Sequence, residues 1–131
     1  MMEGPVFVSV NDAIAIHRRM VDEFGGDPGL RDRGLLESAL AMPKAVFDGD
    51  YLHVDLPRMA AAYHYHLCAN HPFIDSSKRV AVAVAEVFLR ANGLHLVATD
   101  DEIVELTHGV ASGMTGKPEV THFHVDRVSE R

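Results

Sequence analysis

Apolar residues recur at helical spacing in several stretches of the chain, and short polar or glycine-rich segments separate these stretches. The pattern predicts five helices, over residues 11–24, 31 or 32 to 42, 55–70, 76 or 77 to 91, and 99–110, with a last short helix within 119–131. Glycine or proline follows several of them, as at Gly25, Pro43 and Gly93. No stretch predicts a credible sheet. The sequence therefore predicts an all-α single domain, residues 1–131, built as a bundle of five to six helices.

Two stretches have distinctive patterns. Residues 44–54 carry scattered apolar side chains around an Asp48-Gly49 turn signal, which predicts an exposed loop or short hairpin and a candidate flap. Residues 77–91 are apolar on nearly every side, so this helix is expected to be the buried central rod of the domain. Its polar stripe contains Arg79, Glu86 and Arg90, and the last two have the spacing of an ion pair.

Composition and charge narrow the class of protein. The chain has 131 residues, of which 47% are hydrophobic and 24% are charged, as in one ordinary globular domain. Its formal net charge of -7 disfavours nucleic acid as a partner, because binding to phosphates needs a clustered excess of Lys and Arg. The apolar runs are too short to span a membrane. Cys68 is the single cysteine, which excludes an internal disulfide, and we expect a cytoplasmic protein.

Reactive side chains are concentrated in residues 71–79, His-Pro-Phe-Ile-Asp-Ser-Ser-Lys-Arg, which lead directly into the apolar helix. The first N–H groups of a helix have no partner within it and attract phosphate. Adjacent cations strengthen that attraction and favour a polyphosphate such as ATP. The candidate phosphate-binding residues at this helix start are Ser76, Ser77, Lys78 and Arg79.

Three other residues of the segment have separate predicted roles. Bare phosphate would repel Asp75, which favours a role for this carboxylate as a ligand of Mg²⁺ that bridges the phosphates. His71 can accept a hydroxyl proton near neutral pH and is the candidate general base. Phe73 is expected to point inward and anchor the loop.

The remaining histidines are weaker candidates for a metal site. His64 and His66 are two positions apart on a predicted helix and point about 200° away from each other, so they cannot share an ion. His122 and His124 have no evident third ligand and are interpreted as surface residues. Zinc is therefore disfavoured.

Residues 71–79 resemble the signature of the Fic/Doc family, His-x-Phe-x-Asp-Gly/Ala-Asn-Lys/Gly-Arg. The likeness continues upstream, in residues 25–43, and downstream, in residues 88–93, where it is similar to the Doc, or death-on-curing, branch. The resemblance implies a small all-α toxin of a toxin–antitoxin pair. Such a toxin transfers a phosphoryl group from ATP to a Ser or Thr hydroxyl of a translation factor, for example elongation factor Tu.

The resemblance also implies roles for individual residues. His71 would deprotonate the target hydroxyl, Asp75 would hold Mg²⁺, and Arg90 would be a further candidate contact to phosphate. Members that transfer AMP typically have Gly in place of Lys78, so Lys78 favours phosphoryl transfer. An antitoxin would supply an inhibitory helix in trans, and the target would dock at the flap, residues 44–54, by strand addition.

Ser76 and Ser77 depart from the family pattern, in which Gly or Ala and then Asn are expected. Loss of the Asn amide removes a donor aimed at phosphate, and one such donor can contribute roughly 2.7 to 4 kcal/mol of transition-state stabilisation. Two alternatives to the kinase therefore stay open. One is a weakened or inactive domain that serves as an antitoxin-binding module, and the other is an AMP transferase.

Overall fold

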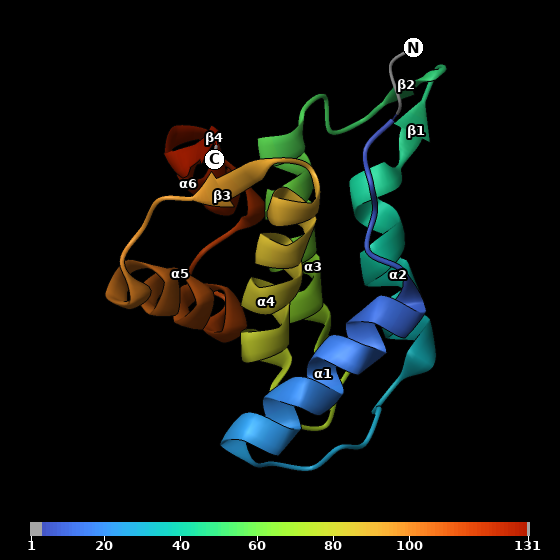
Figure 1. Cartoon of the computed structure of the whole chain (residues 1–131), viewed down its shortest axis with the longest axis vertical. Helices are drawn as coiled ribbons and strands as arrows, with labels where there is room; N and C mark the ends of the chain where they lie inside the picture. The colour runs from blue at the N-terminus through green and yellow to red at the C-terminus, as the bar shows by residue number, and fades with distance from the viewer. Residues whose placement is uncertain (1–3, 131) are drawn as a thin grey trace.

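Six helices make up most of the structure, a computed structural model that describes residues 4–130 (Figure 1). In chain order they are α1 (Val10–Phe24), α2 (Arg33–Ala41), α3 (Leu56–Asn70), α4 (Ser77–Ala91), α5 (Asp100–Ser112) and α6 (Lys117–Arg127), with a 3-10 turn, η1 (Met42–Lys44), after α2. The predicted helical bundle is confirmed. The sixth helix begins earlier than expected, because Pro118 fits the first turn of a helix and does not break it. Within residues 4–130, no helix has the length and apolarity needed to cross a membrane.

Two small antiparallel strand pairs complete the fold. The first, β1 (Val46–Phe47) with β2 (Asp50–Tyr51), forms the hairpin that the sequence predicted within residues 44–54. Its turn residues Asp48 and Gly49 have φ of 53° and 86°, the left-handed pair that a tight two-residue turn needs. The second pair, β3 (Leu94–Leu96) with β4 (Val128–Glu130), was not predicted, because a helix was expected up to the last residues of the chain.

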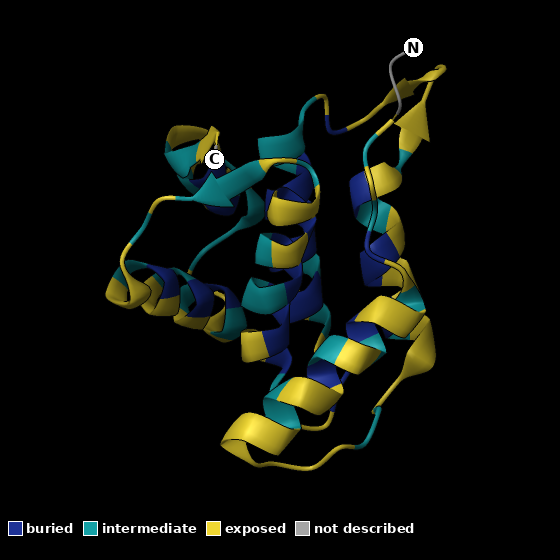
Figure 2. Ribbon diagram, viewed as in Figure 1, coloured by how far each residue is buried: buried dark blue, intermediate teal, exposed yellow. Residues whose placement is uncertain are grey.

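The central position in the bundle belongs to α3. Every residue of α3 except Ala69 is buried or half-buried, and the helix packs against α2, α4, α5 and α6 (Figure 2). The predicted buried rod, residues 77–91, is buried on one face only. Its other face is partly open, with Val87 43% exposed and the charged residues Lys78, Arg79 and Arg90 at the surface. That face borders the cavity described below.

Small side chains on α3 let its neighbours approach closely. Ala60, Ala61 and Ala62 are fully buried, and the larger Tyr63 packs against Phe88 of α4 with ring centroids 5.1 Å apart. The backbone N–H of Val8 donates a hydrogen bond of 2.9 Å to the Tyr63 hydroxyl, so this buried oxygen has a partner. Burial raises the pKa of Tyr63 to about 12.

The core also contains a polar network, and its presence corrects the interpretation of His124 as a surface residue. His124 on α6 is fully buried, and its Nε2 lies 3.0 Å from Nδ1 of His64 on α3. Nε2 of His64 lies 2.8 Å from Oγ1 of Thr107 on α5, and the Thr107 hydroxyl donates to the carbonyl of Ile103. Thr107 therefore accepts from His64, and His64 accepts from His124. His122, two residues away, is exposed as predicted.

Burial sets the charge state of this network. It lowers the pKa of His64 to about 4 and that of His124 to about 3, with the neighbouring His64 as a second cause for His124. Both rings are therefore neutral at pH 7. A neutral His64 is also what the hydrogen bonds require, because its Nδ1 accepts from His124 and a doubly protonated imidazole cannot accept a hydrogen bond.

Candidate functional site

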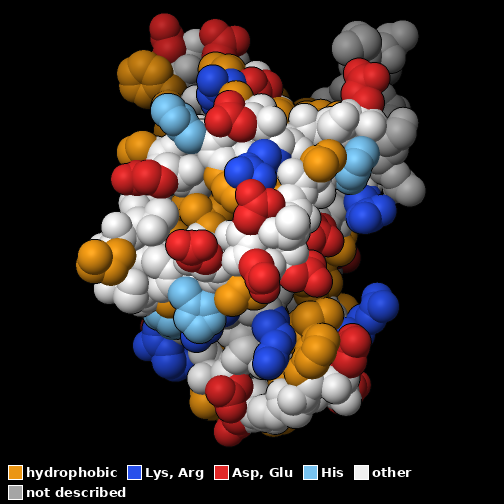
Figure 3. Space-filling view, turned by 90° about the vertical axis from the view of Figure 1, so that its left-hand side faces the viewer, with side chains coloured by type: hydrophobic (Ala, Val, Ile, Leu, Met, Phe, Trp, Pro, Cys, Tyr) orange, Lys and Arg blue, Asp and Glu red, His pale blue; other side chains and the backbone are white. Residues whose placement is uncertain are grey.

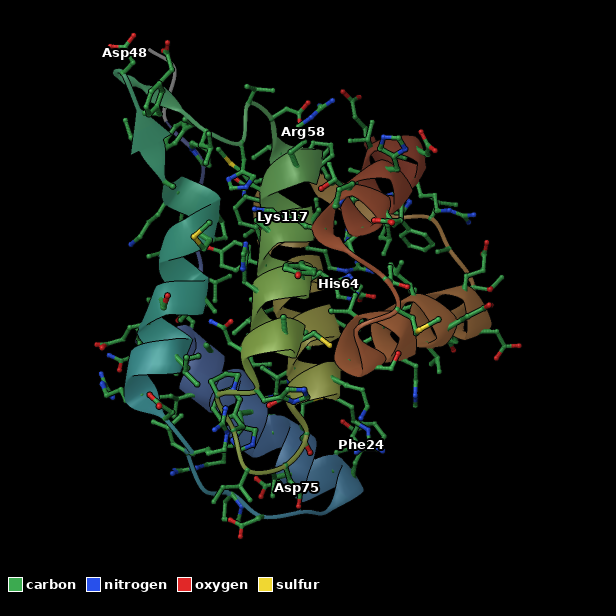
Figure 4. The ribbon with its side chains drawn as sticks, turned by 180° about the vertical axis from the view of Figure 1, so that it is seen from behind. Phe24, Asp48, Arg58, His64, Asp75 and Lys117 are labelled. Atoms are coloured by element: carbon green, nitrogen blue, oxygen red, sulfur yellow. The ribbon has the colours of Figure 1, made fainter. Side chains whose placement is uncertain are left out.

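A cavity of about 1180 Å³ opens where α4 begins. It lies between the last turn of α1, the segment 71–79, one face of α4 and one face of α5. Figure 4 shows Phe24, at the end of α1, and Asp75, in the loop, at the same end of the molecule. Six of the seven predicted site residues line the cavity, namely His71, Asp75, Ser76, Ser77, Lys78 and Arg79.

Arg90 is the predicted site residue that does not line the cavity. It is exposed on the last turn of α4, beyond Glu86, which does line the cavity. Ion pairs among residues 4–130 join Arg33 to Glu37, Arg58 to Asp55 and Arg127 to Glu102. The predicted pair of Glu86 with Arg90 is therefore wrong, and a contact of Arg90 to phosphate stays a prediction.

The loop that carries His71 is anchored by a contact between Phe73 and α1. Phe73 is buried, as predicted, and its ring stacks on the ring of His17 with centroids 3.9 Å apart. His17 is buried on α1, and its Nε2 lies 3.0 Å from the backbone carbonyl oxygen of Asp75. Sequence reasoning missed His17. Its signal was its position on the inward face of the first helix, in register with Ala13 and Met20.

The carboxylate of Asp75 lies against the backbone of the segment that follows α1. Its Oδ2 accepts a hydrogen bond of 3.0 Å from the N–H of Asp27. Gly26 has φ of 115°, and a Cβ added there would lie 3.3 Å from Cβ of Asp75, so glycine permits this close approach.

The donor set around Asp75 suits only certain metals. Among residues 4–130 there is no group of three or more His, Cys, Asp or Glu placed to hold a metal ion. A metal bound at Asp75 would therefore have at most two such ligands from these residues. That coordination suits Mg²⁺, which is commonly held by one or two carboxylates together with substrate phosphates.

The two serines have different positions at the start of α4. Ser76 is the N-cap residue by position, but its side chain makes no capping hydrogen bond, and its φ of 69° is left-handed. Ser76 therefore does not cap α4 with its side chain. Ser77 is buried, and its Oγ lies 3.3 Å from both the N and the O of Phe73, so it ties the helix to the loop.

The start of α4 keeps its capacity to attract an anion. The N–H of Val80 bonds to the carbonyl of Ser76 at 2.9 Å, and the three N–H groups before it have no partner within the helix. The side chains of Lys78 and Arg79 add two full charges there, and the Arg79 guanidinium lies over the ring of Phe24, 4.7 Å from its centroid. Figure 3 shows the side of the molecule that lies on the left in Figure 1. Several Lys and Arg side chains are visible toward the lower end of this side, although the whole chain carries a net charge of -7.

The hairpin of residues 44–54 lies away from this cavity. Figure 4 shows Asp48, in the hairpin turn, at the opposite end of the molecule from Asp75, and no residue from 44–54 lines the cavity. The reason is that the hairpin precedes α3 and the segment 71–79 follows it, and a helix of 15 residues is about 22 Å long. The geometry therefore does not support target docking at the hairpin of residues 44–54.

A different segment, residues 27–32, runs beside the loop. The N–H of Ile74 donates to the carbonyl of Gly29 at 3.1 Å, and Leu30 forms an isolated bridge with Phe73. The N–H groups of Arg31 and Asp32 donate to the carbonyl of Pro72 at 2.8 and 3.0 Å. The sequence indicated only a turn here, because each of these bonds joins residues about 40 positions apart.

Comparisons with known proteins identify the family of the chain. The Fic/DOC family matches residues 7–89, a range that includes α1, α3, the segment 71–79 and most of α4. The chain is 33% identical over 106 residues to "Protein kinase doc" of Escherichia phage P1, a match that covers 81% of this chain and 82% of that protein. It is 42% identical over 78 residues to "Toxin Doc" of Mycolicibacterium smegmatis, which covers 60% of each chain. The chain therefore belongs to the Fic/DOC family.

Proposed function

We propose that this protein is a Doc-type toxin that transfers the γ-phosphoryl group of ATP to a Ser or Thr hydroxyl of a protein target. The observation that carries the proposal is the cavity, which His71, Asp75 and the cationic start of α4 line together. The names of the two relatives, a protein kinase and a toxin, support the same class of activity. The expected target class is a translation factor, with elongation factor Tu as the first candidate.

In the proposed reaction, His71 acts as the general base. Its imidazole takes the proton from the target hydroxyl as the hydroxyl oxygen forms a bond to the γ-phosphorus. The bond from that phosphorus to the oxygen that bridges it to the β-phosphate breaks, and ADP leaves. His71 then returns its proton to solvent, which restores the base.

The start of α4 supplies most of the electrostatic stabilisation in this proposal. The unpaired N–H groups of its first turn and the side chains of Lys78 and Arg79 would hold the phosphates and offset the negative charge of the transition state. Asp75 would hold Mg²⁺, which neutralises phosphate charge when it is bound. The apolar side of the cavity, which includes Met20, Val82 and Ile103, would exclude water around the nucleotide.

A catalytically weakened or inactive domain is the second candidate. The observation in its favour is the hydroxyl of Ser77, which is bonded to the backbone of Phe73 and is not free to bind phosphate. In that case the protein would act as a binding module for its antitoxin. The same antitoxin would restrain an active enzyme, by placing an inhibitory helix against the cavity.

Isotopically labelled ATP separates these functions. The purified protein would be incubated with a bacterial translation extract and ATP labelled on either the α- or the γ-phosphorus. The kinase proposal requires transfer of the γ label alone to a protein band. Transfer of the α label would show AMP transfer and overturn the proposal, and transfer of neither label would favour the inactive module.

A further inference from the structure

We propose that Arg31 is a positioning residue that holds His71 in the orientation that the reaction needs. This inference deepens the proposed function and rests on it for the role of His71. Arg31 is not among the residues that line the cavity, and its hydrogen bonds go to none of the candidate phosphate-binding residues. Its contacts are instead made with the backbone that carries the base.

Three consecutive carbonyl oxygens accept hydrogen bonds from this one residue. Nε of Arg31 donates to the carbonyl of His71 at 2.7 Å, and one terminal nitrogen donates to the carbonyl of Asn70 at 2.8 Å. Its backbone N–H donates to the carbonyl of Pro72 at 2.8 Å. Arg31 therefore follows the chain as it leaves α3 and passes through His71 into the loop.

The end of α3 needs such a partner. The last carbonyls of a helix have no partner within it and carry partial negative charge, which a cation stabilises. His71 follows the helix in the left-handed region, with φ of 47° and ψ of 56°. A residue with a Cβ costs roughly 1 to 2 kcal/mol in this conformation, which is why glycine is usual there. The hydrogen bonds from Arg31 oppose that cost and keep the backbone of His71 in place.

The guanidinium of Arg31 forms its hydrogen bonds with the carbonyls of Asn70 and His71. Among residues 4–130, Arg31 forms no ion pair with a carboxylate, and the adjacent Asp32 uses its side chain to cap α2 through the N–H of Leu35. The side chain of Asn70 donates to the carbonyl of Leu35 at 3.2 Å and adds a second tie between α2 and the end of α3. A lysine at position 31 could keep the charge but could not span two carbonyls with a planar fork.

The two ends of the loop are therefore held by different contacts, one through Arg31 at His71 and the other through Ser77 at Phe73. Phosphate binding depends on the start of α4, which Ser77 ties to Phe73 independently of Arg31. Loss of the Arg31 side chain would free the backbone at His71 but leave the start of α4 in place. We therefore expect a lower kcat with an unchanged KM for ATP, because a displacement of the base by about 1 Å can cost up to 100-fold in rate.

The test uses Arg31→Ala and Arg31→Lys, with Arg33→Ala as the matched control. Arg33 is an exposed arginine two residues away, and its Nε lies 3.6 Å from a carboxylate oxygen of Glu37, an arrangement of small energetic value. We expect kcat for phosphoryl transfer to fall roughly 10- to 100-fold in Arg31→Ala and to stay unchanged in Arg33→Ala. A raised KM for ATP with an unchanged kcat would overturn the positioning role.

A second measurement does not need activity. The ring resonances of His71 would be followed by ¹H–¹³C NMR in the folded protein, and we expect them to shift in both Arg31 variants and to stay unchanged in Arg33→Ala. Unchanged His71 resonances in both Arg31 variants would overturn the inference, whether or not the wild type transfers phosphate. If the wild type transfers nothing and the resonances still shift, the proposed function fails while the positioning role stands. If Arg31→Ala does not fold, the His71 resonances of Arg31→Lys alone decide whether the inference stands.

Discussion

His64 lies in the C-terminal half of α3 and His71 directly follows the last residue of that helix, seven positions on, and their surroundings are opposite. His64 is 1% exposed, both of its ring nitrogens have partners, and its pKa is lowered to about 4 by burial. His71 is exposed, sits on a left-handed backbone and lines the cavity. Burial and complete pairing make His64 a structural connector, whereas His71 is exposed at the left-handed end of the helix, as the proposed general base would need to be.

The largest expected effect comes from a substitution of His71, the exposed histidine of this pair. His71→Ala should lower phosphoryl transfer by roughly 100- to 10,000-fold, the range that general-base catalysis contributes. It should leave the free energy of unfolding almost unchanged, because no buried contact is lost. The measurement is incorporation of the γ label, paired with urea denaturation. His122→Ala, an exposed histidine on α6, is the control, and full activity of His71→Ala would exclude this residue as the base.

The second effect concerns the buried histidines, His64 and His124. The folded pKa values of His64 and His124 lie below the usual value of 6.5, so the unfolded chain binds more protons as the pH falls below 6.5. Stability is therefore fully present above pH 6.5 and is lost as the pH falls toward about 4. These two histidines should together contribute about 3 kcal/mol to the fall in the free energy of unfolding between pH 7.5 and 5.5, as measured by urea denaturation. His66 and His53, whose pKa values burial also lowers, add to the fall in the same direction.

The neighbouring histidines on α6 provide the control for that effect. His124→Gln removes one titrating ring and should reduce the drop in unfolding free energy by about 1.4 kcal/mol, the share of one histidine. His122→Gln removes an exposed ring from the same helix and should leave the drop unchanged. Equal behaviour of the two variants would show that burial of His124 does not control the acid sensitivity of the fold.

A smaller effect on activity is expected for a substitution of Ser77, the first residue of α4. Ser77→Asn would restore the amide that the family pattern has at this position, and we expect transfer of the γ label to rise about 10-fold, less than the full contribution of a preorganised donor. The larger side chain should also lower stability, because Ser77 is buried and bonded to Phe73. A fall in transfer without a change in stability would contradict this prediction.

The smallest effect concerns backbone strain near His71. Ser76 has φ of 69°, and Ser76→Gly should stabilise the fold by about 1 kcal/mol, because glycine adopts this conformation without a Cβ clash. Thermal denaturation would detect the gain as a rise in Tm. Ser129→Gly, in the exposed strand β4, serves as the control and should not stabilise. A lower Tm for Ser76→Gly would mean that the serine hydroxyl has a stabilising role.

Local patterns accounted for the helices, the hairpin turn and most of the site. Capping residues such as Ser9 and Thr99 and the apolar periodicity act within one helix, so the sequence expresses them directly. The site residues were found because residues 71–79 are contiguous. Burial of His124, the pairing of β3 with β4 and the placement of residues 27–32 beside the loop depend on contacts between distant segments, and no local pattern encodes them.

The single thiol of the chain provides a built-in reporter of how α3 separates from α5. Cys68 is buried, its Sγ lies 3.5 Å from the carbonyl oxygen of Thr107, and burial raises its pKa to about 11. Alkylating reagents need an accessible thiolate, so the closed protein should resist them. The rate of maleimide labelling under native conditions would then measure transient opening of α3, the helix that precedes the proposed base His71, without any engineered label.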